Sequence, residues 1–218
     1  MKVLKPPQSG SSAGTTAGRN RFGQYERTRA IPVNPNSAAQ GLVRARMSAN
    51  SAAWRAITAA QRAGWADLGT SMVRSDSLGQ SYTLQGNQAY ASVNNNRLLC
   101  GLAVVADAPG LVTPPALTGA VITLTSASFS IAYTPTPMPA ATYLAVFASP
   151  QRSAGRNYEG DFRFIKLSAA AGASPLVMLT EYSAKFGAPV TGNRIFLSLV
   201  AITLGFESGA LITSAVVS

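Results

Sequence analysis

The pattern of apolar residues changes in kind across residues 101–115, GLAVVADAPGLVTPP, a stretch rich in glycine and proline. Before it, apolar residues recur at the spacing of helices, and after it they alternate with polar ones, as in strands. Glycine and proline interrupt regular structure, so the change marks a boundary. The sequence therefore predicts an α+β chain: a helical region of about three helices over residues 37–100, a linker over residues 101–115 and a β domain over residues 116–218.

The first helix is predicted over residues 38–56. The stripe that should face a core consists of Val43, Met47, Asn50, Trp54 and Ile57, with Arg44, Arg46 and Arg55 largely off it. Asn36 or Ser37 can cap the start of this helix, because either side chain accepts hydrogen bonds from the first free N–H groups. Pro32 and Pro35 keep the preceding segment extended.

A second helix is predicted over residues 59–68. Thr58 and Gln61 have the spacing of a capping box, and Gly69 is expected to end the helix. The two predicted helices, joined by a tight break, resemble a DNA-binding helix-turn-helix in their order and spacing. We favour an ordinary pair of antiparallel helices with Trp65 and Leu68 in its core, because the second helix offers few polar side chains for reading bases.

A third helix is predicted over residues 84–99, after a turn or short hairpin that contains Asp76-Ser77-Leu78-Gly79. Its apolar side should hold Ala89 and Val93. The run from Asn94 to Asn96 is unfavourable inside a helix. We expect these amides to pair with backbone from the N-terminal arm or from a neighbouring chain.

Seven short strands are predicted in the β domain. They lie near residues 119–125, 127–133, 142–149, 161–168, 175–181, 194–204 and 210–217. In the strand SFSIAY, Phe129, Ile131 and Tyr133 share one face. This half of the chain is similar in outline to immunoglobulin-like and fibronectin type III β-sandwiches, although it lacks the cysteine pair and the tryptophan of antibody domains. That outline implies a binding or spacing module.

Residues 1–36 are predicted to form an extended basic arm without a core of its own. The segment carries six lysines and arginines against the single acid Glu26 and has few large apolar residues, so it should order only against another surface. Three interpretations remain open: a strap on a neighbouring protein, which we favour, contact with nucleic acid, or a local hairpin. The candidate partner-binding residues are Arg19, Arg21, Phe22, Tyr25, Arg27 and Arg29.

Positive charge is concentrated in the N-terminal half of the chain. Residues 1–108 hold 12 of the 18 basic residues and 4 of the 8 acidic ones, within a net charge of +10. Clustered cations attract acidic partners, whether nucleic acid, an anionic membrane or an acidic protein surface. Only 12% of the residues are charged, which suggests a surface partly covered by neighbours.

Composition argues against an enzyme. The chain has no histidine and one cysteine, which removes the commonest general base, histidine-dependent nucleophile pairs and CxxC sites. We interpret Cys100 as a small buried apolar residue and the close acid pair Glu159 and Asp161 as a solvated turn. No catalytic, cofactor-binding or metal-binding residue is proposed. No secretory signal or membrane helix is apparent, so synthesis in a cytoplasm is expected.

The N-terminal half resembles small structural proteins encoded by tailed bacteriophages and prophages. The resemblance covers about residues 14–100 and rests on Ala17-Gly18-Arg19-Asn20-Arg21-Phe22-Gly23, Ile31-Pro32-Val33-Asn34-Pro35, Gln40, Val43-Arg44, Trp54, Thr58, Gln61-Arg62, Trp65 and Asn94 to Leu99. It implies a virion component whose arm and helices bind repeating subunits while the β domain is displayed or interlocked outside. Capsid decoration or cement proteins combine such parts, as do tail and connector proteins.

The resemblance also implies the partners. They would be the major capsid protein or other virion subunits, and copies of this chain would associate with one another. No membrane partner and no cofactor are implied. A DNA-binding protein is the alternative of another class, with the basic arm and the helix arginines on phosphates.

Overall fold

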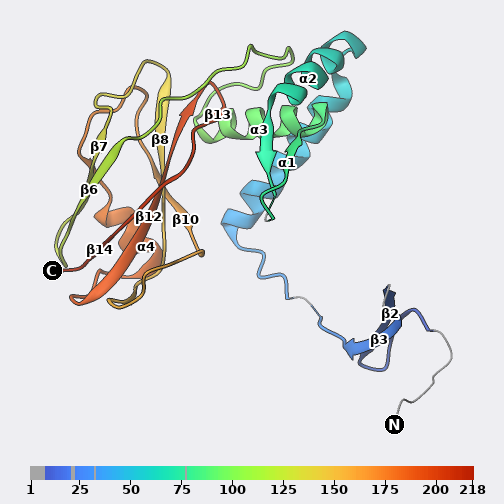
Figure 1. The fold of residues 1–218 in the computed structure, drawn as a ribbon, viewed down its shortest axis with the longest axis horizontal. Coiled ribbons are helices and arrows are strands. Elements are labelled where there is room, and N and C mark those ends of the chain that lie inside the picture. Colours follow the sequence, from blue (N-terminus) through green and yellow to red (C-terminus); the bar gives the residue numbers. More distant parts are fainter. Residues whose placement is uncertain (1–7, 21–22, 32, 77) are drawn as a thin grey trace. The chain divides into compact units, whose positions relative to one another are not determined.

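The computed structural model describes residues 8–20, 23–31, 33–76 and 78–218 and is of mixed α+β class. It divides into two compact units, one ending at Leu42 and the other running from Val43 to Ser218. Figure 1 shows the helices and strands along the chain. The division falls inside the helix predicted over residues 38–56. Residues 101–115 lie within the second unit, so they do not separate the helices from the β domain.

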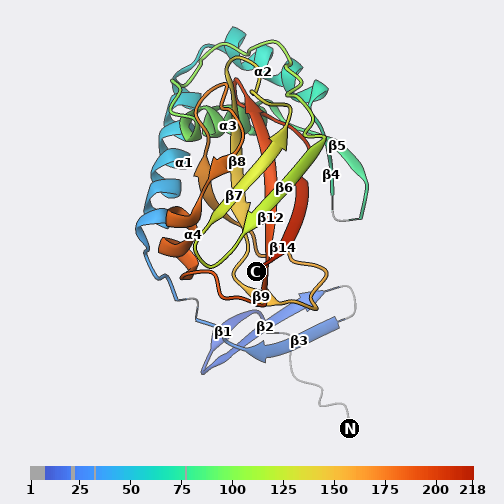
Figure 2. The ribbon, with the colours of Figure 1, turned by 90° about the vertical axis from the view of Figure 1, so that its left-hand side faces the viewer.

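The first unit contains a three-stranded antiparallel sheet of β1 (Gly10–Ser12), β2 (Thr15–Asn20) and β3 (Gly23–Thr28), in that order (Figure 2). The expectation of a single extended arm is therefore corrected in favour of local strand pairing. Ala13 and Gly14 allow the first turn with φ of 44° and 81°. The Arg29 N–H donates to the Gly14 carbonyl at 2.7 Å and closes the sheet beyond β3.

Helix α1 (Ala38–Ala56) has the predicted bounds. Ser37 caps its start: the Gln40 N–H donates to Ser37 Oγ at 3.3 Å, and the Ser37 N–H donates to Gln40 Oε1 at the same distance. This reciprocal pair satisfies two N–H groups that a helix start would otherwise leave open. Local sequence is therefore enough to place the beginning of α1.

Helix α2 (Ala59–Ser71) starts at the predicted capping box of Thr58 and Gln61 but continues past Gly69. The glycine serves close packing, not helix termination. A side chain at Gly69 would place its Cβ 2.4 Å from the Leu84 carbonyl oxygen, in the segment that leads into α3. Only glycine permits that approach.

Helix α3 (Gly86–Leu99) packs against α2 around Trp65, whose ring meets that of Tyr90 edge-on at 5.1 Å. Both rings are buried, as are Leu68 and Ala89. Between the two helices, β4 (Val73–Ser75) and β5 (Ser81–Thr83) form the hairpin expected around Asp76.

Residues 101–115 pack along the helices, so they are not a free linker. The Trp65 indole N–H donates to the Ala106 carbonyl at 2.7 Å. Asn94 is fully buried and pairs twice with Val105, accepting from its N–H at 2.9 Å and donating to its carbonyl at 3.2 Å. The expectation that these amides pair with the arm or a neighbouring chain is therefore corrected: Asn94 pairs with residues 101–115, Asn96 donates to the Gly205 carbonyl at 2.9 Å, and Asn95 pairs with the Asn50 side chain.

The β domain consists of two antiparallel sheets. One has the order β11 (Leu176–Val177), β7 (Phe129–Thr134), β6 (Gly119–Leu124). In the other, β8 (Thr142–Ala148) lies between β10 (Arg163–Leu167) and β12 (Asn193–Thr203), and β14 (Leu211–Val216), β9 (Arg152–Ser153) and β13 (Phe206–Glu207) also pair with β12.

One predicted strand is wrong in part: residues 175–181 give only the two residues of β11 before helix α4 (Leu179–Phe186) begins. The reason is the spacing of Leu179, Tyr182 and Phe186, which favours a helix over a strand. Tyr182 is fully buried and meets Phe129 edge-on at 5.2 Å, so α4 closes one side of the core.

The two sheets face each other across one apolar core. Phe129, Ile131 and Tyr133 of β7 share one face, as predicted, and that face points inward and forms one buried cluster with residues of the other sheet. On β12 the inward residues include Ile195 and Leu197, which alternate with Phe196 and Ser198 on the other face. Figures 1 and 2 show the two layers.

The helices and the β domain meet at the turn between β12 and β13. Gly205 there has φ of 100°, and a Cβ on it would lie 2.6 Å from the Val93 carbonyl oxygen of α3. Phe206, the next residue, is buried among the side chains around Trp65 and Tyr90. The second unit is therefore one body in which α3 rests on the end of the sheet.

Candidate functional site

The sheet of β1–β3, together with Arg29 directly after it, holds those predicted partner-binding residues that the structure describes. Of its residues 8–19 and 23–28 none is buried, and the same holds for residues 29–31 and 33–36 that follow. A sheet without buried side chains gains little stability from its own packing. Its exposed faces can therefore contact another surface. Two of the predicted residues, Arg21 and Phe22, lie outside the described residues.

Strand register places Tyr25 and Arg27 on one face of this sheet. Gly18 is the partner of Tyr25, and Thr16 is the partner of Arg27. The Tyr25 ring lies over Gly18, where a Cβ on the glycine would lie 2.8 Å from the ring, and 45% of Tyr25 stays exposed. Arg29 follows directly after β3, two residues beyond Arg27, so the alternation of side chains along the strand places it on the same side. Two cations and an aromatic ring therefore gather on this face, which we call the Tyr25 face.

Arg19 belongs to the opposite face. It pairs with Gln24, and the neighbouring pair on that face is Ala17 with Glu26. Because side chains alternate along a strand, Arg19 cannot join Tyr25 and Arg27 in one flat contact. The predicted set is thus divided by the fold: Tyr25, Arg27 and Arg29 come together, and Arg19 shares its face with an acid.

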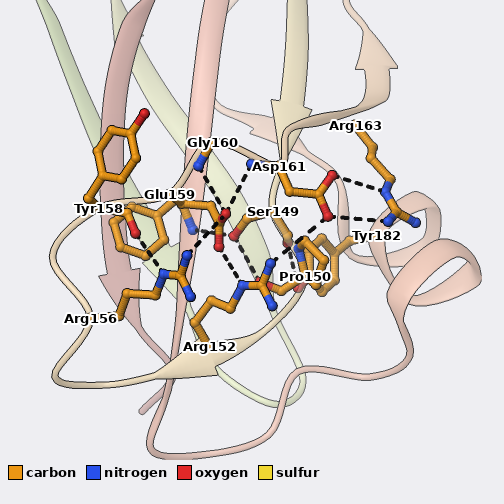
Figure 3. Close-up of polar contacts among 11 residues, drawn as sticks. Ser149, Pro150, Arg152, Arg156, Tyr158, Glu159, Gly160, Asp161, Arg163 and Tyr182 are labelled. Carbon is orange, nitrogen blue, oxygen red and sulfur yellow. Dashed lines mark hydrogen bonds and ion pairs between the residues drawn. The ribbon is translucent and has the colours of Figure 1, made fainter. Parts of the chain in front are cut away.

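A second polar cluster, which the sequence interpretation missed, lies in the connection from β8 to β10 (Figure 3). Its centre is Glu159, which is only 4% exposed. The carboxylate pairs with the Arg152 guanidinium, lies 3.5 Å from Arg156, and accepts the N–H groups of Gly160 and Asp161 at 2.9 and 3.0 Å. The interpretation of Glu159 as a solvated turn residue is therefore wrong.

The second acid of the pair does remain near solvent. Asp161 has a side chain that is 44% exposed and pairs with Arg163 at 3.2 Å and Arg152 at 3.9 Å. The only sequence signal for the buried cluster was the arginine at each of two positions shortly before Glu159. Spacing alone does not reveal that the loop folds back so that both reach one carboxylate.

Hydrogen bonding keeps Glu159 ionised. The pKa of its carboxyl is lowered from 4.5 to about 2, first by the Asp161 N–H and next by the Arg152 guanidinium, against a raising effect of burial. A carboxylate whose pKa lies this far below neutral pH is a poor general base, and both of its oxygens already accept hydrogen bonds. We therefore assign the cluster to holding the β8–β10 connection in place.

This assignment predicts an acid-sensitive contribution to stability. Because the pKa of Glu159 is lower in the folded state, its contribution is complete above about pH 4.5 and disappears as the pH falls towards 2. Glu159→Gln should lower the free energy of unfolding at pH 7, and the difference from wild type should shrink below pH 4.5. Urea unfolding at a series of pH values measures it, with Asp161→Asn at the exposed partner as a control of smaller effect. An equal deficit at pH 7 and pH 3 would argue against the assignment.

Other chemistry finds little support among the described residues. Within residues 8–20, 23–31, 33–76 and 78–218, no group of three or more histidine, cysteine, aspartate or glutamate side chains is placed to hold a metal ion. Cys100 is buried, as expected, and burial raises the pKa of its thiol to about 11 against a lowering by Arg97. None of the helices in the described part of the chain has the length and apolar content of a membrane-spanning segment.

Comparison of the chain with protein-family models, with curated proteins and with solved structures finds no significant match.

Proposed function

We propose that this chain is a structural protein of a tailed-phage or prophage particle, which binds the capsid lattice and stabilises it as a decoration or cement protein. The observation that carries the proposal is the basic sheet of β1–β3, which has no buried described side chain and precedes a separate compact unit. A small, coreless sheet is suited to adding its surface to a partner. A tail or head–tail connector protein would use the same parts.

The Tyr25 face supplies the contact chemistry. Arg27 and Arg29 can donate charge-assisted hydrogen bonds to carboxylates of neighbouring subunits, and the Tyr25 ring offers apolar area with a polar end. One exposed ion pair contributes only about 0.2–1 kcal/mol. In a particle the same contact repeats around a symmetric lattice, and linked contacts raise overall affinity far more than each does alone.

For the β domain we propose a fibronectin-III-like sandwich. The chain passes β6–β7 in one sheet, crosses to β8 and β10 in the other, returns to β11, and crosses again to β12 and β14. This alternation between a three-stranded and a larger sheet supports the assignment. The role proposed for this domain is contact between subunits or display on the particle surface.

Reversing charge on the Tyr25 face tests the proposal. In particles assembled from the same phage or prophage genome, Arg27→Glu/Arg29→Glu should reduce the copies incorporated by at least about tenfold, because two favourable pairs become repulsive. Arg19→Glu on the opposite face is the matched control and should be incorporated nearly as wild type. Quantitative gel analysis of purified particles measures both.

Two outcomes would contradict the proposal. Equal incorporation of the double variant and wild type would remove the role of the Tyr25 face. The DNA-binding alternative would be favoured if the wild-type chain did not associate with particles but bound duplex DNA at low salt, and if the double variant lost that DNA binding.

A further inference from the structure

Helix α1 presents its core stripe to solvent over its first half. Val43, Met47, Asn50 and Trp54 lie on one face at intervals of four, three and four residues. Exposure falls along this row, from 56% at Val43 and 44% at Met47 to 2% at Asn50, and Trp54 is half-buried. Leu42, next to the row, is 55% exposed. The helix thus carries an apolar surface that the described residues of the second unit do not cover.

A groove of about 410 Å³ between α1 and α3 continues this apolar stripe. Met47, Trp54 and Tyr90 supply its apolar walls, and the Trp54 and Tyr90 rings lie 5.3 Å apart. Arg55 and Gln88 are among its polar lining residues. This volume is in the range of about 300–1,000 Å³ typical of binding sites, and aromatic walls with a few polar groups are their usual lining.

The walls of the groove are held together by asparagines. Asn50 Nδ2 donates to Asn95 Oδ1 at 2.7 Å, and Asn95 Nδ2 contacts Met47 Sδ at 3.0 Å, so α1 and α3 are joined at its base. Asn50 Oδ1 is buried and has no hydrogen-bond partner among the described residues. Buried polar atoms are normally paired.

Charge around the groove selects the occupant. Helix α1 contains Arg44, Arg46 and Arg55 and no acid, and Arg55 lines the groove. In a symmetric dimer the same surface meets itself, so a second copy of this chain would bring arginines towards arginines. An acidic partner would instead be attracted by the positive charge of this helix.

We propose that the stripe of Val43 and Met47 together with the α1–α3 groove docks an acidic amphipathic helix of a different protein, which places a large apolar side chain in the groove against Met47 and Trp54. The docked helix would cover the exposed half of α1, and its carboxylates would lie near Arg55 at the groove and the other arginines of α1. Helix-in-groove binding of this kind is recognised by apolar anchors at intervals of three and four residues. The inference rests on the proposed function only in expecting that the partner is another virion subunit.

Two synthetic peptides test the chemistry with the full-length protein. Both are amphipathic helices of about 18 residues with leucines at helical spacing, one with glutamates on its polar face and its twin with lysines. The glutamate peptide should bind at least about tenfold more tightly than the lysine twin. Fluorescence anisotropy of labelled peptide measures affinity.

Variants locate the binding surface. Met47→Glu should weaken binding of the glutamate peptide at least about tenfold, because it places a like charge at the centre of the surface. Val73→Glu is the matched control, since Val73 is also an exposed apolar residue, 62% exposed, but lies on β4. Circular dichroism of each variant checks that both remain folded. Equal binding of the two peptides, or equal weakening by both variants, would overturn the proposal.

Sedimentation equilibrium distinguishes the remaining occupant. A wild-type dimer that Met47→Glu dissociates would show that a second copy covers this surface, and would overturn the acidic-partner proposal. Failure of the docking proposal can be distinguished from failure of the proposed function. If the chain enters particles but does not bind the acidic peptide, only the docking proposal is contradicted. If the chain binds the peptide but never enters particles, only the proposed virion role is contradicted.

Discussion

Replacing Trp65 with alanine is expected to lower the free energy of unfolding of the second unit by about 3–5 kcal/mol. Trp65 is fully buried, contacts the Tyr90 ring, and donates its indole N–H to the Ala106 carbonyl. Its removal would leave a large cavity between α2, α3 and residues 101–115, and would also leave the Ala106 carbonyl without this hydrogen bond. Urea unfolding followed by circular dichroism measures the loss without relying on tryptophan emission.

Two variants separate the contributions at this position. Trp65→Phe keeps part of the ring but loses the hydrogen bond, so it should fall between wild type and alanine. Trp54→Ala removes the half-buried tryptophan of the groove and should cost clearly less stability than Trp65→Ala. A stability of Trp65→Ala within about 1 kcal/mol of wild type would be inconsistent with a core built around this side chain.

Removing residues 1–36 should reduce incorporation into particles by about a hundredfold or more while the second unit stays folded. The buried clusters around Trp65 and around Phe129 consist entirely of residues after Val43, so their packing does not need the arm. Loss of a linked contact removes the affinity gain of repeated attachment. The size of the effect distinguishes this deletion from the charge reversal, which changes only one face.

A length-matched replacement controls for spacing. Exchanging residues 8–28 for a glycine and serine linker keeps the reach of the arm but removes the sheet and its charges. The replaced chain should fail to enter particles as the deletion does. If it is incorporated normally, the arm acts only as a tether and the contact assigned to the Tyr25 face is wrong.

Elements whose signals are local were predictable. The starts of α1 and α2 follow from cap residues within a few positions, and the buried face of β7 follows from simple alternation. The three-stranded sheet of the arm was not, because its strands carry too few apolar residues for a period to appear. Its first turn also places Ala13, which is no turn signal, at positive φ.

Properties that depend on distant contacts were beyond sequence patterns. Helical spacing identified the stripe of α1, but a period says which face is apolar and not whether anything covers it. Glu159 was misjudged for a related reason: its burial depends on how the loop returns Arg152 and Arg156 to one carboxylate. Which candidate arm residues share a face became clear only from the strand register, because a shift of one residue moves every side chain to the other face of the sheet.

The most direct test of the account is the copy number of this chain in purified particles. Quantitative mass spectrometry of particles assembled with the wild-type chain, and of particles assembled with the chain lacking residues 1–36, compares the two forms at equal expression. Particles should contain many copies of the wild-type chain and almost none of the shortened chain, which should remain folded in the unassembled fraction. Absence of the wild-type chain from particles, or equal copies of both forms, would contradict it.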